Sequence, residues 1–112
     1  MDKQYLYIIT RKDLSASQVA VQSIHSAFEM GRFFCPDKTH PSVVLIKTEN
    51  EQELEAVSKY LENANLNYKS FREPYYGNSL TSIALEPIGE DKRPLLKKFK
   101  LFRNKDFQEI KL

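Results

Sequence analysis

The stretch QYLYIITRKDLSASQVAVQSIHSAFE, residues 4–29, passes from an apolar run through a polar turn into a helical pattern. Residues 4–10 are rich in β-branched and aromatic side chains, which predicts a buried strand. Ser15 or Ser17 is suited to cap the following helix, which we expect over residues 16–34, ending before a proline. A helix that directly follows a buried strand is typical of α/β folds.

The rest of the chain continues this alternation of strands and helices. We expect strands at residues 42–48, 67–73 and 80–87, an amphipathic helix at 50–64 and a short helix at 91–99. The Gly77-Asn78 pair predicts a turn between the last two strands. The order β-α-β-α-β-β-α predicts a single α/β domain over residues 1–112, with a mixed four-stranded β-sheet and helices on both faces.

Composition excludes several classes of protein. Hydrophobic residues make up 41% of the chain and charged residues 29%, which is typical of a globular domain. Neither a membrane-spanning run nor a signal peptide is present, so we expect a cytoplasmic protein without membrane contacts. The single cysteine, Cys35, is expected to be structural or incidental. One cysteine and two histidines do not predict a metal site.

Basic side chains are concentrated at the C-terminal end. Residues 1–89 contain 9 basic and 11 acidic side chains, whereas residues 90–112 contain 8 basic and 4 acidic ones. This basic segment, residues 90–112, therefore carries a charge of +4 on a body of −2. Such a segment either contacts phosphates or is a solvated lysine-rich tail, and the sequence leaves both interpretations open.

The first predicted helix has two stripes of side chains. Small and apolar residues recur at helical spacing and predict the face that packs on the sheet: Ala16, Val19, Ala20, Ser23, Ile24, Ala27 and Phe28. A second stripe is polar and consists of Gln18, Gln22, His25, Glu29 and Arg32.

The polar stripe has two interpretations. It is either a solvated face, on which His25 and Glu29 form an ordinary i, i+4 pair, or part of a binding site. The second interpretation gains support because a helix that starts after a buried strand is a common ligand site. Backbone amides near Ser15–Gln18 would there receive a phosphate or a developing oxyanion.

Acidic side chains come at the ends of two predicted strands. Asp13 follows the first strand and Glu73 ends the third, at the edge of the sheet where small α/β proteins keep their chemistry. Pro74, Tyr75 and Tyr76 follow Glu73 and would partly remove its carboxyl from water, as a general acid or base requires. The tyrosines suit stacking on a base. A surface glutamate, and tyrosines that only cover the sheet end, are the open alternatives.

Four motifs in this order resemble the type-2 peptidyl-tRNA hydrolase family, in particular its compact bacterial and phage-type relatives. RKDL at residues 11–14 is similar to the family's Arg-x-Asp-Leu turn, and VAVQSIHSA at 19–27 to its helix with Ala-Gln and His-Ala. SVVLIKT at 42–48, with the acidic helix after it, follows the family's second strand. LTSIALEP at 80–87 is similar to its last strand.

The resemblance covers roughly residues 4–102 and implies an α/β enzyme that uses no cofactor or metal. Such an enzyme hydrolyses the ester between a peptidyl or aminoacyl group and the 3′ end of tRNA. Two positions differ from the family: Gln18 stands where a lysine is usual, and Glu73 stands where the family has an aspartate.

The resemblance also implies roles for particular residues. Glu73 would activate or orient the water, and His25 would hold Glu73 or share the proton transfer. Hydrogen bonds to the carbonyl or ribose would come from Gln18, Gln22 and Thr81. Asp13 completes the set of candidate catalytic residues. The expected RNA contacts are Arg11, Lys12, Tyr75, Tyr76, Lys97, Lys98, Lys100 and Arg103.

Two rival interpretations keep the predicted fold without the hydrolysis. Because Gln18 carries no charge, the chain is alternatively a catalytically altered module that binds tRNA or another nucleic acid. The third interpretation is a small regulatory domain that forms a homodimer through its sheet edge, with no RNA involved. The basic segment favours the two interpretations that include RNA.

Overall fold

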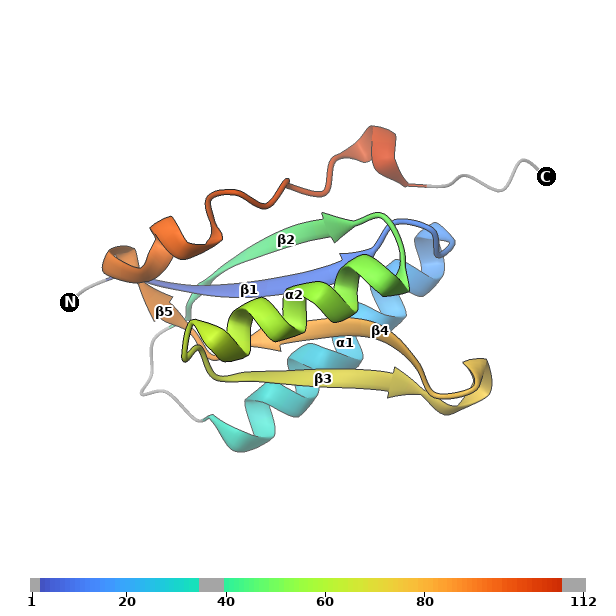
Figure 1. The fold of residues 1–112 in the computed structure, drawn as a ribbon, viewed down its shortest axis with the longest axis horizontal. Coiled ribbons are helices and arrows are strands. Elements are labelled where there is room, and N and C mark those ends of the chain that lie inside the picture. The colour runs from blue at the N-terminus through green and yellow to red at the C-terminus, as the bar shows by residue number, and fades with distance from the viewer. Residues whose placement is uncertain (1–2, 35–39, 108–112) are drawn as a thin grey trace.

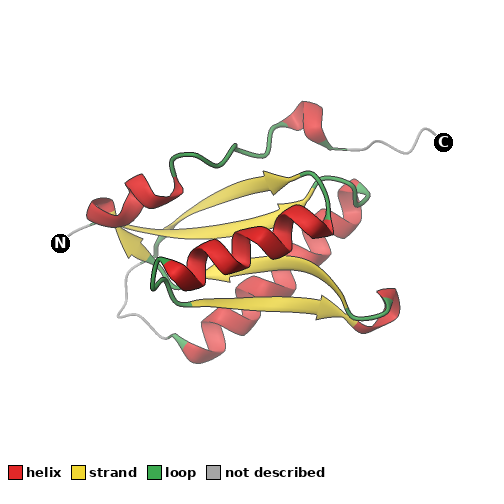
Figure 2. Ribbon diagram, viewed as in Figure 1, coloured by secondary structure: helices red, strands yellow, loops and turns green. Residues whose placement is uncertain are grey.

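The computed structural model describes residues 3–34 and 40–107, which form one α/β domain built on a mixed β-sheet (Figures 1 and 2). Cys35 lies outside the described residues. The strands are β1 (Gln4–Arg11), β2 (Ser42–Thr48), β3 (Tyr68–Glu73), β4 (Ser79–Leu85) and the two-residue β5 (Ile88–Gly89).

The sheet has the order β2-β1-β4-β3, with β5 paired to the start of β1. Strands β1 and β2 run parallel, while β4 runs antiparallel to both β1 and β3. This arrangement confirms the mixed sheet that the sequence predicts. The carboxyl ends of β1, β2 and β3 lie at the same edge of the sheet as the start of β4.

Two α-helices cover the opposite faces of the sheet. Figure 1 shows α1 (Ala16–Phe33) behind the sheet and α2 (Glu51–Asn63) in front of it. Ser15 caps α1 by accepting a hydrogen bond from the Gln18 N–H, and Asn50 caps α2 by accepting one from the Glu53 N–H. Among the described residues, no helix is long and apolar enough to cross a membrane.

Helix α2 packs as its sequence predicts. Its apolar stripe, Leu54, Val57 and Leu61, is buried in the main core, together with Ile9 of β1 and Ile83 of β4. The polar residues of the helix remain on its solvent side. A stripe of three apolar residues at helical spacing thus determined which face of α2 meets the sheet.

Helix α1 is rotated relative to the prediction. Val19, Gln22, Ser26 and Met30 are its buried residues, whereas Ile24 is 67% exposed and Phe28 is 65% exposed.

The predicted burial of Ile24 and Phe28 is therefore wrong. The physical reason is that the sheet beneath α1 presents polar groups from Thr81 and Ser82, which pair with the polar side of the helix. Val19 and Ala27 do pack inward, as predicted.

The chain after β4 departs from the prediction in detail. The strand predicted to Pro87 ends at Leu85, and the helix predicted for residues 91–99 is a 3₁₀-helix, η2 (Glu90–Leu96). Pro94 lies inside η2, where it lacks the N–H that an α-helical hydrogen bond needs. Farther on, η3 (Asn104–Asp106) follows a segment that runs along the sheet.

This later part of the chain covers the free edge of β2 (Figure 1). The Lys47 N–H donates to the Lys100 carbonyl oxygen (3.0 Å), and the Phe102 N–H donates to that of Leu45 (2.9 Å). An isolated bridge joins Ile46 to Leu101. As far as residue 107, the basic segment is therefore attached to the sheet, through residues 100–102.

Candidate functional site

The side chain of Gln22 is the centre of a polar cluster between α1, the end of β3 and the start of β4. Its Nε2 atom donates to Glu73 Oε1 (3.1 Å) and to Gln18 Oε1 (3.1 Å). Its Oε1 atom accepts a hydrogen bond from the Thr81 hydroxyl (2.6 Å). Gln22 is 0% exposed, so its buried amide holds Gln18 and Glu73 from the protein interior. We call Gln18, Gln22, Glu73 and Thr81 the Gln22 cluster.

The hydrogen bonds of the cluster fix the direction of both amides. The Thr81 hydroxyl faces Gln22 Oε1, so the Gln22 nitrogen faces Glu73 and Gln18. The Gln18 oxygen is then occupied, and within the described residues no group accepts the N–H bonds of its amide. Gln18 and Glu73 are both partly exposed. An amide donor and a carboxylate therefore lie side by side above Gln22.

Small hydroxyl side chains bring α1 close to the sheet around this cluster. The Ser82 hydroxyl of β4 donates to the Gln22 carbonyl oxygen (2.5 Å), and Thr10 of β1 shares a hydrogen bond with Ser23 (2.7 Å). Every fully buried side-chain nitrogen or oxygen among the described residues has a hydrogen-bond partner. The polar interface is thus fully satisfied, which keeps the position of α1 specific.

His25 lies one turn beyond Gln22 on the side of α1 that faces β3. Its ring stacks on Phe71, with ring centroids 4.2 Å apart and planes 4° from parallel. Within the described residues, no hydrogen bond joins His25 to Glu73. His25 is exposed, so one face of its ring stacks on Phe71 and the ring adds to the protein surface beside the Gln22 cluster.

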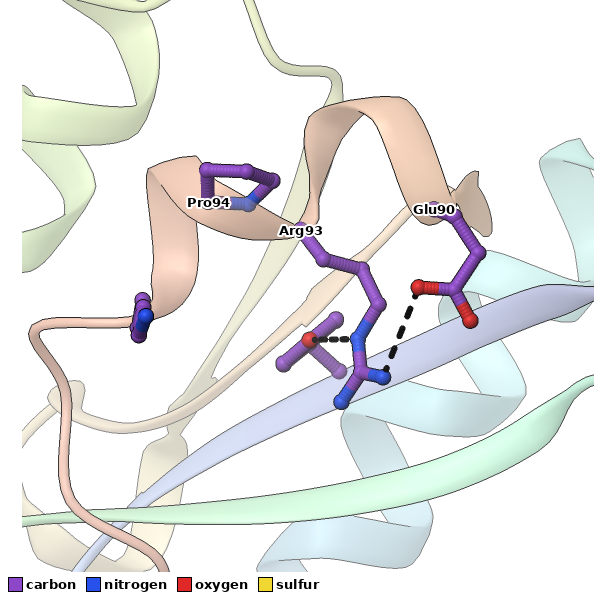
Figure 3. Close-up of a pocket in the computed structure, with 5 residues that line it drawn as sticks. Glu90, Arg93 and Pro94 are labelled. Carbon is purple, nitrogen blue, oxygen red and sulfur yellow. Dashed lines mark hydrogen bonds and ion pairs between the residues drawn. The ribbon is translucent and has the colours of Figure 1, made fainter.

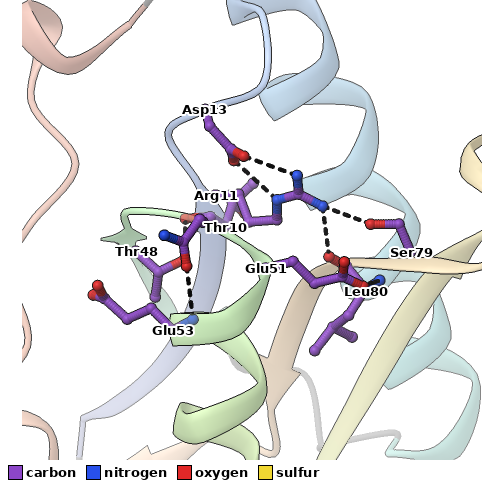
Figure 4. A network of polar contacts seen from close by, with 9 residues as sticks. Thr10, Arg11, Asp13, Thr48, Glu51, Glu53, Ser79 and Leu80 are labelled. Atoms are coloured by element: carbon purple, nitrogen blue, oxygen red, sulfur yellow. Dashed lines mark hydrogen bonds and ion pairs between the residues drawn. The ribbon is translucent and has the colours of Figure 1, made fainter.

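A second polar network joins the end of β1 to the start of β4 (Figure 4). The Arg11 guanidinium donates two hydrogen bonds to the Asp13 carboxylate, both of 2.9 Å. It also donates to the Ser79 hydroxyl (2.6 Å) and to the Leu80 carbonyl oxygen (3.1 Å). This network holds the turn before α1 against the residues that precede Thr81, so it supports the Gln22 cluster from outside.

The first turn of α2 also contributes to this network. Glu51 Oε2 accepts a hydrogen bond from the Leu80 N–H (2.7 Å), and this bond lowers the pKa of the Glu51 carboxyl below its ordinary value. The hydrogen bond to Asp13 in turn raises the pKa of Arg11. Both groups are thereby stabilised in their charged forms.

The structure brings together most of the catalytic candidates named from the sequence. Gln18, Gln22, Glu73 and Thr81 are connected by hydrogen bonds, and His25 lies beside them. Asp13 is bound by Arg11 instead, and no hydrogen bond among the described residues joins it to the cluster.

The expected aromatic contacts to RNA lie next to this site. Tyr75 and Tyr76 form η1 (Pro74–Tyr76), which begins directly after Glu73. Tyr75 is 93% exposed and Tyr76 is 45% exposed. Left-handed backbone at Gly77 and Asn78 then turns the chain into β4, as the sequence predicts. The exposed rings of Tyr75 and Tyr76 therefore lie in the loop between β3 and β4, directly after Glu73. Figure 1 shows this loop beyond the end of β3.

The expected basic contacts fall into two groups. Lys97, Lys98, Lys100 and Arg103 are exposed along the basic segment. Lys98 also lies over the Tyr60 ring, with its nitrogen 3.5 Å from the ring centre. Arg11 and Lys12 instead lie at the end of β1 and pair with carboxylates, Arg11 with Asp13 and Lys12 with Glu49 (3.1 Å).

Sequence reasoning missed Ser82, Glu51 and Ser79. A signal for Ser82 was present, because Thr81-Ser82 places two adjacent polar residues in an otherwise buried strand. No local pattern indicates the bonds of Glu51 and Ser79, since their partners lie 29 and 68 residues away in the sequence. Within the described residues, no group of three or more His, Cys, Asp or Glu side chains could hold a metal ion.

Comparison with known proteins shows the fold. No family model matches the chain, and no curated protein matches it. Among solved structures, the chain is similar to Atu0240 of Agrobacterium tumefaciens strain C58, a protein of unknown function. The TM-score is 0.68 at 12% sequence identity, over 92% of this chain and 100% of the other. At that identity the similarity extends to the arrangement of strands and helices alone.

Proposed function

We propose that the protein is a peptidyl-tRNA hydrolase-like esterase of the type-2 class, which hydrolyses the ester between a peptidyl or aminoacyl group and the tRNA 3′ end. The observation that supports this proposal most is the fully buried Gln22 amide, which joins Gln18 and Glu73 at the surface. A buried amide with every hydrogen bond assigned is an effective way to fix reacting groups.

In this reaction Glu73 acts as the general base. A water bound to its carboxylate loses a proton to it and attacks the ester carbonyl carbon. The tetrahedral intermediate then breaks its bond to the ribose oxygen, which takes the proton from Glu73 and leaves as the tRNA hydroxyl. Gln22 holds one oxygen of Glu73 in place, and no hydrogen bond within the described part of the chain occupies the other, which orients the water.

Gln18 supplies the complementary donor. Its oxygen is held by Gln22, and its amide N–H groups are directed to the carbonyl oxygen as negative charge develops there. An amide does not titrate near neutral pH, so Gln18 orients and stabilises but transfers no proton. Thr81 is 0% exposed and acts through Gln22, as a positioning residue.

The RNA lies across the surfaces beside this site. Tyr75 and the outer face of His25 offer exposed rings on which the terminal adenosine stacks. The exposed side chains of Lys97, Lys98, Lys100 and Arg103 hold the phosphates farther along the acceptor end. The reaction takes place in the cytoplasm, where peptidyl-tRNA is produced.

The rival functions have less support in the geometry. A binding module has no need for a carboxylate held beside an oriented amide donor. A dimer through the β2 edge competes with residues 100–102, which already pair with that edge. The opposite edge strand, β3, carries Lys69 and Arg72, and charged side chains on an edge strand disfavour sheet-to-sheet pairing.

Release of peptide from purified peptidyl-tRNA tests the proposal. Wild-type protein is expected to release peptide, and Glu73→Gln is expected to lower turnover about a hundredfold or more while tRNA affinity stays nearly unchanged. Glu62→Gln makes the same chemical change at an exposed position of α2 and is expected to leave turnover unchanged.

Gln18→Lys restores the residue usual in the family and is expected to keep or raise turnover. No turnover in either the wild type or Gln18→Lys would contradict the hydrolase. A Glu73→Gln variant as active as the wild type would also contradict it, because the base would then lie elsewhere.

A further inference from the structure

A pocket of about 330 Å³ lies at the other end of β1 from the Gln22 cluster, between that strand and η2 (Figure 3). Its lining residues are Tyr7, Glu90, Arg93, Pro94 and Lys97. It opens on the side of the sheet that α2 covers, since Tyr7 belongs to the core that includes Leu54. It is therefore separate from the proposed ester site.

The guanidinium of Arg93 is held in a fixed position in this pocket. Its Nε atom donates to the Tyr7 hydroxyl (2.9 Å), and its central carbon lies 3.9 Å from the centre of the Tyr5 ring. Both tyrosines are buried and form part of the core. A guanidinium fixed by stacking and by one hydrogen bond loses little entropy when it binds a planar or tetrahedral anion.

The carboxylate of Glu90 forms an ion pair with Arg93 but no hydrogen bond. Glu90 Oε2 lies 3.8 Å from Arg93 Nη1, which is longer than a hydrogen bond, and Glu90 also accepts the hydroxyl of Tyr5. The Arg93 side chain is still 37% exposed. Its terminal nitrogens therefore retain hydrogen-bonding capacity toward a ligand.

Lys97 adds a second positive charge to the pocket. It is exposed, and no ion pair among the described residues includes it. Two cations against one carboxylate leave a net charge of about +1 in a concave site, which favours a phosphate.

Farther along the chain, Lys98 and Lys100 line a separate hollow beside β2. This hollow also contains Glu49 and Glu53, so the Arg93–Lys97 pocket has the fewer carboxylates among its lining residues.

We propose that the Arg93–Lys97 pocket binds a backbone phosphate of the tRNA, as an anchor remote from the ester. This inference rests on the proposed function for the choice of RNA. Arg93 supplies a rigid bidentate donor and Lys97 supplies a point charge.

Binding of tRNA measured against salt concentration tests the anchor. Lys97→Gln is expected to weaken binding about fivefold at 0.1 M salt and to lower the slope of log K against log salt by about 0.7–0.9, the value for one released phosphate. Lys92→Gln removes the same charge from η2, which ends directly before Lys97, at a position that does not line the pocket, and is expected to have a clearly smaller effect on both quantities.

Arg93→Lys provides the second variant. It keeps the charge and loses the stacked, bidentate geometry, so binding is expected to weaken although the net charge is unchanged. Thermal unfolding of each variant confirms that it is folded. Equal binding by the wild type, Lys97→Gln and Arg93→Lys would overturn the inference, as would Lys92→Gln matching Lys97→Gln.

The phosphate anchor and the hydrolase activity are tested by separate outcomes. If the wild type binds tRNA without hydrolysing it, the proposed esterase activity is contradicted. Binding of tRNA by the Lys97→Gln and Arg93→Lys variants still tests the anchor. Side-chain NMR of the Arg93 Nε–H group, titrated with inorganic phosphate, distinguishes the source of the anion. A shift with phosphate but no effect of the variants on tRNA binding would assign the pocket to small anions and overturn the RNA anchor.

Discussion

The two α-helices cover opposite faces of one sheet, yet they bury different kinds of side chain. Helix α2 buries Leu54, Val57 and Leu61, whereas α1 buries Gln22 and Ser26 and leaves Ile24 exposed. The α2 face therefore supplies the larger apolar core, whereas the α1 face combines a smaller apolar cluster around Met30 with the hydrogen-bonded polar cluster. Burial of Gln22 on a helix that leaves Ile24 exposed is the contrast on which the proposed function rests.

The largest expected effect is on the α2 face. Leu54 is 0% exposed, so Leu54→Ala leaves a cavity and should lower the free energy of unfolding by about 2–5 kcal/mol. Urea denaturation measures this change, with exposed Gln52→Ala on the same helix as the control. A loss below about 1 kcal/mol would mean that the apolar core does not depend on α2.

A smaller effect is expected where the two faces meet, at the start of β4. The pKa of Glu51 is lowered by its hydrogen bond from the Leu80 N–H, so its carboxylate stabilises the folded state at neutral pH. A lowered folded-state pKa means that this contribution is present above the unfolded-state value, about 4.3, and is lost as the pH falls below it.

The matching variant is Glu51→Gln, which should lower the free energy of unfolding at pH 7 and reduce its decline between pH 7 and pH 3. Urea denaturation across this range measures both quantities, with exposed Glu62→Gln as the control. Parallel pH profiles for wild type and Glu51→Gln would show that this hydrogen bond does not couple α2 to β4.

The smallest effect on stability is expected on the outer side of α1. Ile24 is exposed, so Ile24→Gln should change the free energy of unfolding by less than about 0.5 kcal/mol. Val19→Ala, at a buried position of the same helix, serves as the contrast and should destabilise the protein clearly. Equal losses for the two variants would show that α1 packs through its apolar stripe after all.

The order of elements could be predicted from the sequence because each depends on local patterns. Alternating apolar runs, the Ser15 and Asn50 caps and the Gly77-Asn78 turn all act within a few residues. The buried face of α2 could be predicted for a similar reason, because only one face of this helix is apolar.

The rotation of α1 could not be predicted in this way. Its helix offers both an apolar and a polar stripe, and the choice depends on Thr81 and Ser82, which lie about 60 residues away in the sequence. The rule that strand ends carry the chemistry predicts the position of Glu73, but its hydrogen bond from Gln22 is a tertiary result that no local pattern indicates. The pocket around Arg93 likewise joins residues 86 positions apart.

The double variant Gln22→Leu with Thr81→Val tests the contrast between the two helices most directly. It replaces two buried hydrogen-bonding partners by apolar side chains of similar shape, so the free energy of unfolding should stay within about 1 kcal/mol of the wild type. Glu73 and Gln18 lose the amide that positions them, so turnover on peptidyl-tRNA should fall about a hundredfold. Unchanged turnover, together with a clear loss of stability, would contradict the site and show that the Gln22 cluster only supports the fold.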